Sequence, residues 1–127
     1  FFSRRNWFFF FFLGEIIEHI IDPLEFLKSC KEKLNKNGII IITTPNMVSL
    51  KKRIKSVLGI YPEPNGDWDF NHLHLYTRKN LKGICERAGF NVEVMTSTKL
   101  STLRFKLQMY QPFDSLSERI IFRIRKI

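Results

Sequence analysis

The sequence predicts an α/β domain with a mostly parallel sheet, and two observations support this prediction. Two apolar runs, Trp7–Leu13 and Ile39–Ile42, are short and uninterrupted, which is typical of strands buried beneath helices. A helical pattern lies between them, and the order strand, helix, strand is that of a βαβ unit. The chain has 127 residues, of which 44% are hydrophobic and 26% charged, so it can form a globular core.

The first strand is expected at Trp7–Leu13, which contains five consecutive phenylalanines at Phe8–Phe12. Unbroken apolar character predicts that this strand is buried on both faces. Gly14 ends it, and the following segment Glu15–Ile21 mixes polar and apolar residues in the manner of a helical turn.

A helix is expected to begin at Asp22, because Asp22 can cap it, Pro23 suits its first position and Glu25 completes a capping box. The helical spacing continues at Leu24, at Leu27, at Cys30 or Lys31, and at Leu34. Asn35–Gly38 should end the helix, with Gly38 in the left-handed conformation. The second strand follows at Ile39–Ile42 and continues to Thr44.

A basic amphipathic helix is predicted at Met47–Leu58. Its apolar stripe consists of Leu50, Ile54, Val57, Leu58 and Tyr61. Its other faces are basic, with Lys51, Lys52, Arg53 and Lys55. A loop is expected from Gly59 to Asn71.

The remaining elements are a helix and two strands. Thr77 can cap the helix, and Gly89 ends it. Its core face would contain Leu81, Ile84, Cys85 and Ala88. Alternating patterns predict strands at Phe90–Val94 and at Arg119–Ile127, the second with one wetter face. Residues 96–117 show no clear pattern.

The charge limits the classes of partner. Lys and Arg number 21 against 12 Asp and Glu, which gives a net charge of +9 and suits a nucleic acid or an anionic membrane surface. A solvated cationic face explains the same charge.

The sequence also bears on localisation. No apolar stretch approaches the roughly 20 residues that span a bilayer, and no secretion signal is complete. The two cysteines do not form a disulfide scaffold. We therefore expect a cytoplasmic protein, peripheral to a membrane if the basic helix binds lipid.

Glu15, Glu18 and His19 form the most informative constellation. Their spacing of i, i+3 and i+4 places them on one side of a helical turn, directly after a buried strand. Ligands of open α/β sheets bind beyond the carboxyl ends of strands, so these side chains are candidate ligands of a divalent ion. His72 or His74 can supply a fourth ligand. An ordinary helix start with carboxylates near its positive end explains the same spacing.

Three stretches of the chain also resemble class I S-adenosylmethionine-dependent methyltransferases. Residues 13–23 (LGEIIEHIIDP) are similar to the segment after the fourth strand of these enzymes, and residues 34–46 (LNKNGIIIITTPN) to their fifth strand. Residues 71–77 (NHLHLYT), followed by Ala88, Gly89 and Phe90, resemble the segment before the last strands. The resemblance implies a partial Rossmann-like fold with a mostly parallel sheet and an antiparallel last strand. Residues 1–127 would then be one partial domain, with a family-like core at 7–96 and a carboxyl-terminal segment at 97–127.

Within that family, the Glu-x-x-Glu-His motif is similar to two metal-dependent groups, the O-methyltransferases of ubiquinone biosynthesis and the small-RNA 2′-O-methyltransferases. The resemblance implies metal ligands at Glu15, Glu18, His19 and His72, with His74 as the alternative to His72, and catalytic roles for Glu18, His19 and His74. Mg²⁺, Mn²⁺, Fe²⁺ and Zn²⁺ all suit such ligands. The substrate hydroxyl would lose its proton and attack the sulfonium methyl group.

The same resemblance places one wall of the cofactor pocket at Leu13, Gly14 and Glu15. The glycine-rich loop that holds S-adenosylmethionine in the family has no counterpart before Trp7. The chain is therefore expected to be a carboxyl-terminal half that is inactive and binds S-adenosylmethionine poorly by itself. The methyl acceptor would be small or lipid-like, with an RNA 2′-hydroxyl as the alternative acceptor. A different alternative for the chain as a whole is that it is a non-catalytic interaction module or a truncated product. An exposed sheet edge would favour self-association.

Overall fold

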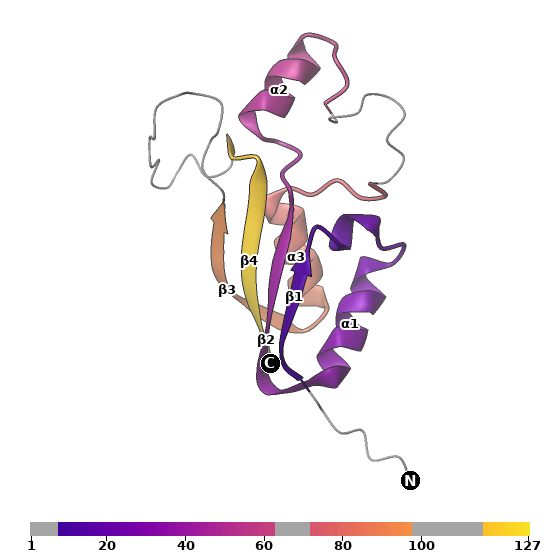
Figure 1. The fold of residues 1–127 in the computed structure, drawn as a ribbon, viewed down its shortest axis with the longest axis vertical. Helices are drawn as coiled ribbons and strands as arrows, with labels where there is room; N and C mark the ends of the chain where they lie inside the picture. The colour runs from indigo at the N-terminus through magenta and orange to yellow at the C-terminus, as the bar shows by residue number, and fades with distance from the viewer. Residues whose placement is uncertain (1–7, 63–71, 98–115) are drawn as a thin grey trace.

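The computed structural model describes residues 8–62, 72–97 and 116–127, which form one sheet with helices (Figure 1). In chain order the elements are β1 (Phe8–Gly14), the 3₁₀ helix η1 (Ile17–His19), α1 (Pro23–Lys33), β2 (Leu34–Pro45), α2 (Leu50–Val57), α3 (Arg78–Arg87), β3 (Phe90–Ser97) and β4 (Arg119–Lys126). Trp7, the end of the predicted loop at 63–71 and residues 98–115 lie outside the described residues.

The sheet has the order β1-β2-β4-β3. β1 and β2 run parallel, whereas β4 lies between β2 and β3 and is antiparallel to both. The βαβ unit and the antiparallel last strand predicted from the sequence are therefore confirmed. Parallel β1 and β2 end at the same edge of the sheet, which is where the candidate site lies.

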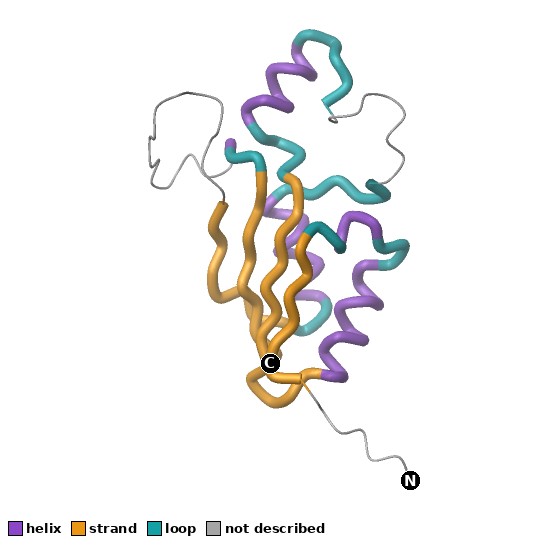
Figure 2. Tube along the Cα trace, viewed as in Figure 1, coloured by secondary structure: helices purple, strands orange, loops and turns teal. Residues whose placement is uncertain are grey.

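The core lies between the sheet and helices α1 and α3, which cover the same face (Figures 1 and 2). The strands contribute mainly Ile40, Ile42, Phe90, Ile120, Phe122 and Ile124 to it, and the helices contribute Leu27, Leu81 and Cys85. The alternation of β4 is as expected, because Arg119 and Arg123 are exposed while the residues between them face the core or are half-buried. Burial of this apolar surface is the main stabilising contribution to the fold.

The prediction that the phenylalanine strand is buried on both faces is wrong. β1 is a strand, but Phe8, Phe9, Phe10 and Phe12 are 45%, 76%, 46% and 58% exposed. Phe10 and Phe12 pair with Ile39 and Ile41, whose neighbours Ile40 and Ile42 face the core. The two phenylalanines therefore lie on the face of the sheet that no helix of the described residues covers.

The turn between α1 and β2 also differs from its prediction. Asn37 takes the left-handed conformation, with φ of 64°, and Gly38 does not. Gly38 is nevertheless required for close packing, because a Cβ atom there would lie 2.9 Å from Cδ2 of Leu34. β2 starts at Leu34, directly after α1, and so includes the residues that were expected to form a turn.

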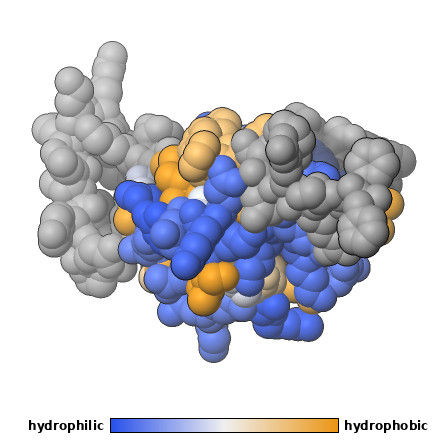
Figure 3. All heavy atoms as spheres, turned by 90° about the horizontal axis from the view of Figure 1, so that it is seen from below, coloured by the Kyte–Doolittle hydropathy of each residue, from blue (hydrophilic) through white to orange (hydrophobic). Residues whose placement is uncertain are grey.

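α2 lies beyond the carboxyl ends of β1 and β2 and is shorter than the predicted helix Met47–Leu58 (Figure 2). None of its residues is buried, so it shields little of the core. None of the described helices combines the length and the apolar character needed to cross a bilayer. Seen from below the view of Figure 1, the described surface is mainly hydrophilic, with apolar patches among the polar residues (Figure 3).

Candidate functional site

Glu18 is buried at the carboxyl end of β1, where η1 begins the connection to α1. The residue is only 1% exposed. Its Oε2 atom accepts a hydrogen bond of 2.9 Å from Thr44 Oγ1, which lies near the end of β2. Its Oε1 atom has no hydrogen-bond partner among the described residues. A buried carboxylate oxygen in this state carries a desolvation cost that a bound cation would offset.

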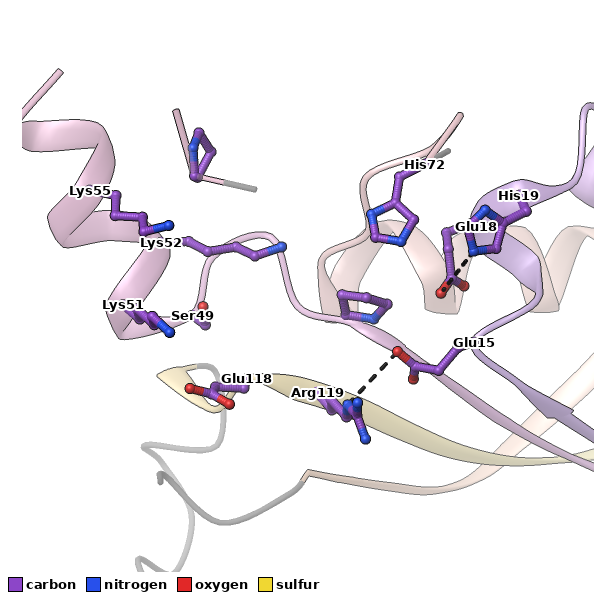
Figure 4. Close-up of a pocket in the computed structure, with 12 residues that line it drawn as sticks. Glu15, Glu18, His19, Ser49, Lys51, Lys52, Lys55, His72, Glu118 and Arg119 are labelled. Carbon is purple, nitrogen blue, oxygen red and sulfur yellow. Dashed lines mark ion pairs between the residues drawn. The ribbon is translucent and has the colours of Figure 1, made fainter. Parts of the chain in front are cut away.

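Two imidazoles lie beside this oxygen. His19 Nε2 is 4.0 Å from Glu18 Oε1, and the rings of His19 and His72 have centroids 4.9 Å apart. One ligand atom from each of Glu18, His19 and His72 lies within 4.8 Å of the other two (Figure 4). A carboxylate and two imidazoles at this separation can coordinate one divalent ion after small side-chain movements.

Backbone hydrogen bonds determine which of the two downstream histidines joins this cluster. The amides of Leu73 and His74 both donate to the carbonyl oxygen of Glu18, over 2.8 and 3.1 Å. The ring of His74 instead lies with Nε2 3.2 Å from the carbonyl oxygen of Ile21. The structure therefore brings His72 to the cluster, and His74 holds the segment in place.

Glu15 lies outside the helical turn that its spacing predicted. Its φ of 53° is left-handed, so the chain changes direction before η1 begins. Its amide donates to the carbonyl oxygen of Thr43 over 2.9 Å, and its Oε1 accepts from Thr43 Oγ1 over 3.1 Å. Its Oε2 lies 3.8 Å from Nε of Arg119, at the start of β4. The expectation that Glu15, Glu18 and His19 share one helical face is wrong, because only Glu18 and His19 belong to η1.

These residues open into a cavity of about 300 Å³, at the lower end of the range for small-molecule sites. Glu15, Glu18, His19 and His72 line one side of it, and Lys51, Lys52 and Lys55 of α2 line the opposite side (Figure 4). Glu118 and Arg119 line it where β4 begins, and the remaining lining residues are Pro45, Ser49 and Pro62. Thr44, Glu118 and Arg119 were not found from the sequence, since no local spacing relates them to Glu15 or Glu18.

Asn46 brings the start of β4 to this site. Its side-chain Nδ2 donates to the carbonyl oxygen of Ser117 over 2.8 Å. Its backbone amide donates to the carbonyl oxygen of Glu118 over 2.8 Å. The residue is fully buried at the end of β2. The Thr-Thr-Pro-Asn end of β2 thus supplies both the hydrogen bond to Glu18 and the anchor for Arg119.

Tyr76 lies beneath the site and is 2% exposed. Burial raises the pKa of its phenol to about 12, and the negative charge of Glu18 adds to this increase. The phenol is therefore neutral at physiological pH. Its hydroxyl donates a long hydrogen bond of 3.5 Å to the carbonyl oxygen of Ile17. Tyr76 supports η1 from the core side.

The three residues expected to contact the cofactor lie in different environments. The side chain of Leu13 is 6% exposed and belongs to the core. Gly14 ends β1, and a Cβ atom there would approach the ring of Phe12 to 2.7 Å. Of the three, only Glu15 lines the cavity.

Comparison with known proteins places these features in a family. The sequence profile of the methyltransferase domain family matches residues 12–94. A ubiquinone biosynthesis O-methyltransferase of Parvibaculum lavamentivorans is 30% identical over 115 residues, and the mitochondrial ubiquinone biosynthesis O-methyltransferase of Bos taurus is 24% identical over 106 residues. These alignments cover 83% and 80% of this chain, but only 44% and 25% of the lengths of the two relatives.

Solved structures agree with this assignment at the level of the fold. A methyltransferase of Thermotoga maritima, described as S-adenosylmethionine-dependent, has a TM-score of 0.66 at 19% identity, over 93% of this chain and 56% of its own. The small RNA methyltransferase HEN1 has a TM-score of 0.63 at 17% identity, over 92% of this chain and 13% of its own. The chain therefore belongs to the methyltransferase domain family, and its fold is part of the Rossmann-like fold of class I S-adenosylmethionine-dependent methyltransferases.

Proposed function

We propose that the protein transfers the methyl group of S-adenosylmethionine to a hydroxyl oxygen of a small or lipid-like substrate, with a divalent metal ion held by Glu18, His19 and His72. The main support is the buried Oε1 atom of Glu18, which has no hydrogen-bond partner among the described residues and faces two imidazoles. Most buried side-chain oxygen atoms have a hydrogen-bond partner, so an oxygen without one among the described residues indicates a position for a ligand.

The ligand types support a transition metal. Imidazole nitrogens suit Zn²⁺ and Fe²⁺ better than Mg²⁺, which prefers oxygen ligands. Three protein ligands leave room for a substrate oxygen, as in catalytic zinc sites. Such an ion would act as a Lewis acid that makes a substrate hydroxyl easier to deprotonate.

The chain's own residues would hold this site in a fixed geometry. Thr44 donates to one oxygen of Glu18 and so leaves the other free to face His19 and His72. The amides of Leu73 and His74 attach the His72 segment to the backbone of Glu18. Hydrogen bonds of this kind orient ligands before the substrate binds, which reduces the reorganisation needed during the reaction.

The methyl donor would approach from the end of β1. Glu15 lines the cavity there, while Leu13 contributes its side chain to the core. The described residues thus offer one edge of a cofactor site, consistent with a chain that spans less than half the length of its curated relatives. We expect weak binding of S-adenosylmethionine to this chain alone. Micromolar affinity in a calorimetric titration would contradict that expectation.

The acceptor class is proposed from the relatives and from α2. Both curated relatives are named as ubiquinone biosynthesis O-methyltransferases. On α2, Ile54, Val57 and Leu58 are 52%, 87% and 67% exposed, and they form an apolar surface next to basic side chains. Such a helix suits the interface of an anionic membrane, where a lipid-like substrate would be found.

Metal titrations test the ligand set. Glu18→Gln and His19→Ala should each weaken binding of Mn²⁺, followed by electron paramagnetic resonance, by at least about tenfold, because each removes a ligand. Glu25→Gln is the control, since Glu25 is exposed and pairs with Lys28 on α1. Circular dichroism would verify that each variant is folded. Unchanged Mn²⁺ affinity in both Glu18→Gln and His19→Ala would refute the metal site.

Flotation and gel-shift experiments test the acceptor class. Vesicles that contain phosphatidylglycerol should bind the protein at low salt, and substitution of Lys51, Lys52, Arg53 and Lys55 by Gln should remove this binding. Vesicles of phosphatidylcholine are the control. Binding of RNA without binding of the anionic vesicles would instead favour the RNA 2′-hydroxyl as acceptor.

A further inference from the structure

We propose that the face of the sheet opposite α1 and α3 binds single-stranded nucleic acid, with bases stacked on Phe10 and Phe12 and the phosphate backbone near Arg123 (Figure 1). The two rings belong to β1 itself, whereas Glu18 and His19 follow the end of that strand. The proposal therefore goes beyond the proposed function, and it depends neither on a metal ion nor on the methyl acceptor.

Two phenylalanine rings provide the stacking surface. Phe10 and Phe12 are two residues apart in β1, so their side chains leave the same face of the sheet, while Phe11 between them packs against the core. Both rings are about half exposed, although phenylalanine is usually buried. A strand rises about 3.3 Å per residue, so the rings start about 7 Å apart, and each can stack with one base of an unstacked strand.

The next two strands place apolar and basic side chains beside these rings. Phe12 pairs with Ile41 of β2, and Ile41 pairs with Arg123 of β4. The neighbouring row repeats this order with Phe10, Ile39 and Arg125. Adjacent strands lie about 4.8 Å apart, so about 10 Å separates each phenylalanine from the arginine of its row. Aromatic rings beside basic side chains on one sheet face are typical of surfaces on which single strands stack.

The two arginines share one carboxylate. Nε of Arg123 lies 3.0 Å from Oε2 of Glu93, and Arg125 donates to both oxygens of the same carboxylate. Arg125 also donates to the carbonyl oxygen of Asn37 over 2.8 Å, so its guanidinium group is held in place. Arg123 is the more exposed of the two, at 44% against 33%. We therefore assign the phosphate contact to Arg123.

The position of these arginines favours a nucleic acid over a protein partner. β4 lies between β2 and β3, so Arg123 and Arg125 are near the middle of the face and not at its rim. A protein layer packed on the face would take both guanidinium groups out of water with a single carboxylate between them, which is costly. A nucleic acid offers phosphate groups to arginine and flat bases to the phenylalanine rings.

The charge of the whole chain supports the same partner. All 127 residues together carry a net charge of +9. The segments that precede β1 and follow β3 in the sequence, residues 1–7 and 98–115, are basic as well, with Arg4, Arg5, Lys99, Arg104 and Lys106 against Asp114. Long-range attraction of a polyanion depends on this summed charge, whatever ion pairs individual side chains form.

Fluorescence anisotropy with a fluorescein-labelled oligoadenylate tests the site at low salt. Phe10→Ala and Phe12→Ala should each weaken binding by at least about fivefold, because each removes a stacking ring. Phe12→Tyr should retain binding, which separates loss of the ring from loss of the fold, and circular dichroism would verify that each variant is folded. Tyr61→Ala is the matched control, since Tyr61 is an exposed aromatic residue outside the sheet, and it should change binding less than about twofold.

Salt titrations separate the two kinds of contact. Arg123→Gln should weaken binding and make it less dependent on salt, because a phosphate contact is lost. Phe12→Ala should leave the salt dependence unchanged, because stacking involves no ion release. A duplex should bind equally to Phe12→Ala and to the unmodified protein, since its paired bases are not available for stacking.

The inference would be overturned if the unmodified protein bound no single strand, or if both phenylalanine variants bound it as tightly as the unmodified protein. Loss of binding only in the variant with the four basic residues of α2 changed to Gln would place the nucleic acid at α2 instead. Dimers that Phe10→Ala and Phe12→Ala dissociate, without any binding of the strand, would assign the face to a second copy of the chain. The Mn²⁺ titrations test the proposed function separately, so either proposal can fail alone.

Discussion

Glu18 illustrates how a single residue depends on contacts that are distant in sequence. Its own position in the Glu-x-x-Glu-His motif indicates a ligand, but its state is set by Thr44, which is 26 residues away. With Oε2 bonded to Thr44 and Oε1 without a hydrogen-bond partner among the described residues, the carboxylate has one oxygen left for a cation. A buried carboxylate oxygen without a hydrogen bond costs stability, and ion binding would offset this cost.

Two buried residues, Tyr76 beneath the site and Cys85 on α3, predict how stability responds to alkaline pH. Burial raises the pKa of Cys85 from 9.0 and that of Tyr76 from 10.0, each to about 12. The unfolded chain therefore loses these protons at lower pH than the folded chain. The free energy of unfolding should fall as pH rises from about 9 to about 12, by at most about 1.4 kcal/mol per pH unit for each group.

Urea denaturation across this pH window measures the effect. Tyr76→Phe and Cys85→Ala should each reduce the slope of stability against pH, whatever they do to stability at neutral pH. Tyr61→Phe is the matched control, because Tyr61 is 47% exposed. An unchanged slope in both core variants would show that neither group is responsible.

At the scale of elements, the helix starts were predictable because capping is local. Asp22 accepts a hydrogen bond of 3.0 Å from the amide of Glu25, as expected for the start of α1. Thr77 caps α3 through a reciprocal box with Asn80. These hydrogen bonds satisfy amides that the first turn of a helix leaves unpaired, so short sequence patterns identify them.

The cap of α3 also provides a stability prediction. Thr77→Ala should lower the free energy of unfolding by about 1 kcal/mol, because the amide of Asn80 loses its acceptor at 3.3 Å. Ser29→Ala is the control, as Ser29 is exposed in the interior of α1, where alanine is the better helix former. Equal losses in the two variants, measured by urea denaturation, would contradict a capping role.

At the scale of the whole molecule, the open face of the sheet is the dominant feature. α1 and α3 cover one face, while Phe10 and Phe12 are exposed on the other. β1 also lies at the edge of the described sheet, with one side paired to β2. An edge strand without charged residues is a template for pairing with another chain.

Self-association through β1 therefore remains a prediction of the sequence that the structure makes more specific. In sedimentation experiments the chain should form concentration-dependent dimers, and Phe10→Lys combined with Phe12→Lys should weaken the dimer by more than about tenfold. Val57→Lys on α2 is the control, since Val57 is 87% exposed but lies away from the sheet. A chain that stays monomeric at every concentration would disprove the prediction.

Local patterns in the sequence were enough to predict the order of strands and helices, the caps of α1 and α3, and the candidate ligands Glu18 and His19. Such features depend on spacings of a few residues, because hydrogen bonds within one turn and alternation along one strand are short-range effects. The resemblance to methyltransferases followed from the same short stretches, and the match to the family over residues 12–94 confirmed it.

Other features depend on contacts between distant parts of the chain. The exposure of the Phe8–Phe12 run depends on which face of the sheet the helices cover. His72 rather than His74 joins the cluster because the backbone amides of Leu73 and His74 donate to the carbonyl oxygen of Glu18. The pairing of Glu15 with Arg119 joins residues at opposite ends of the chain. No spacing within the sequence encodes such contacts, because they exist only after burial of the core has brought β1, β2 and β4 together.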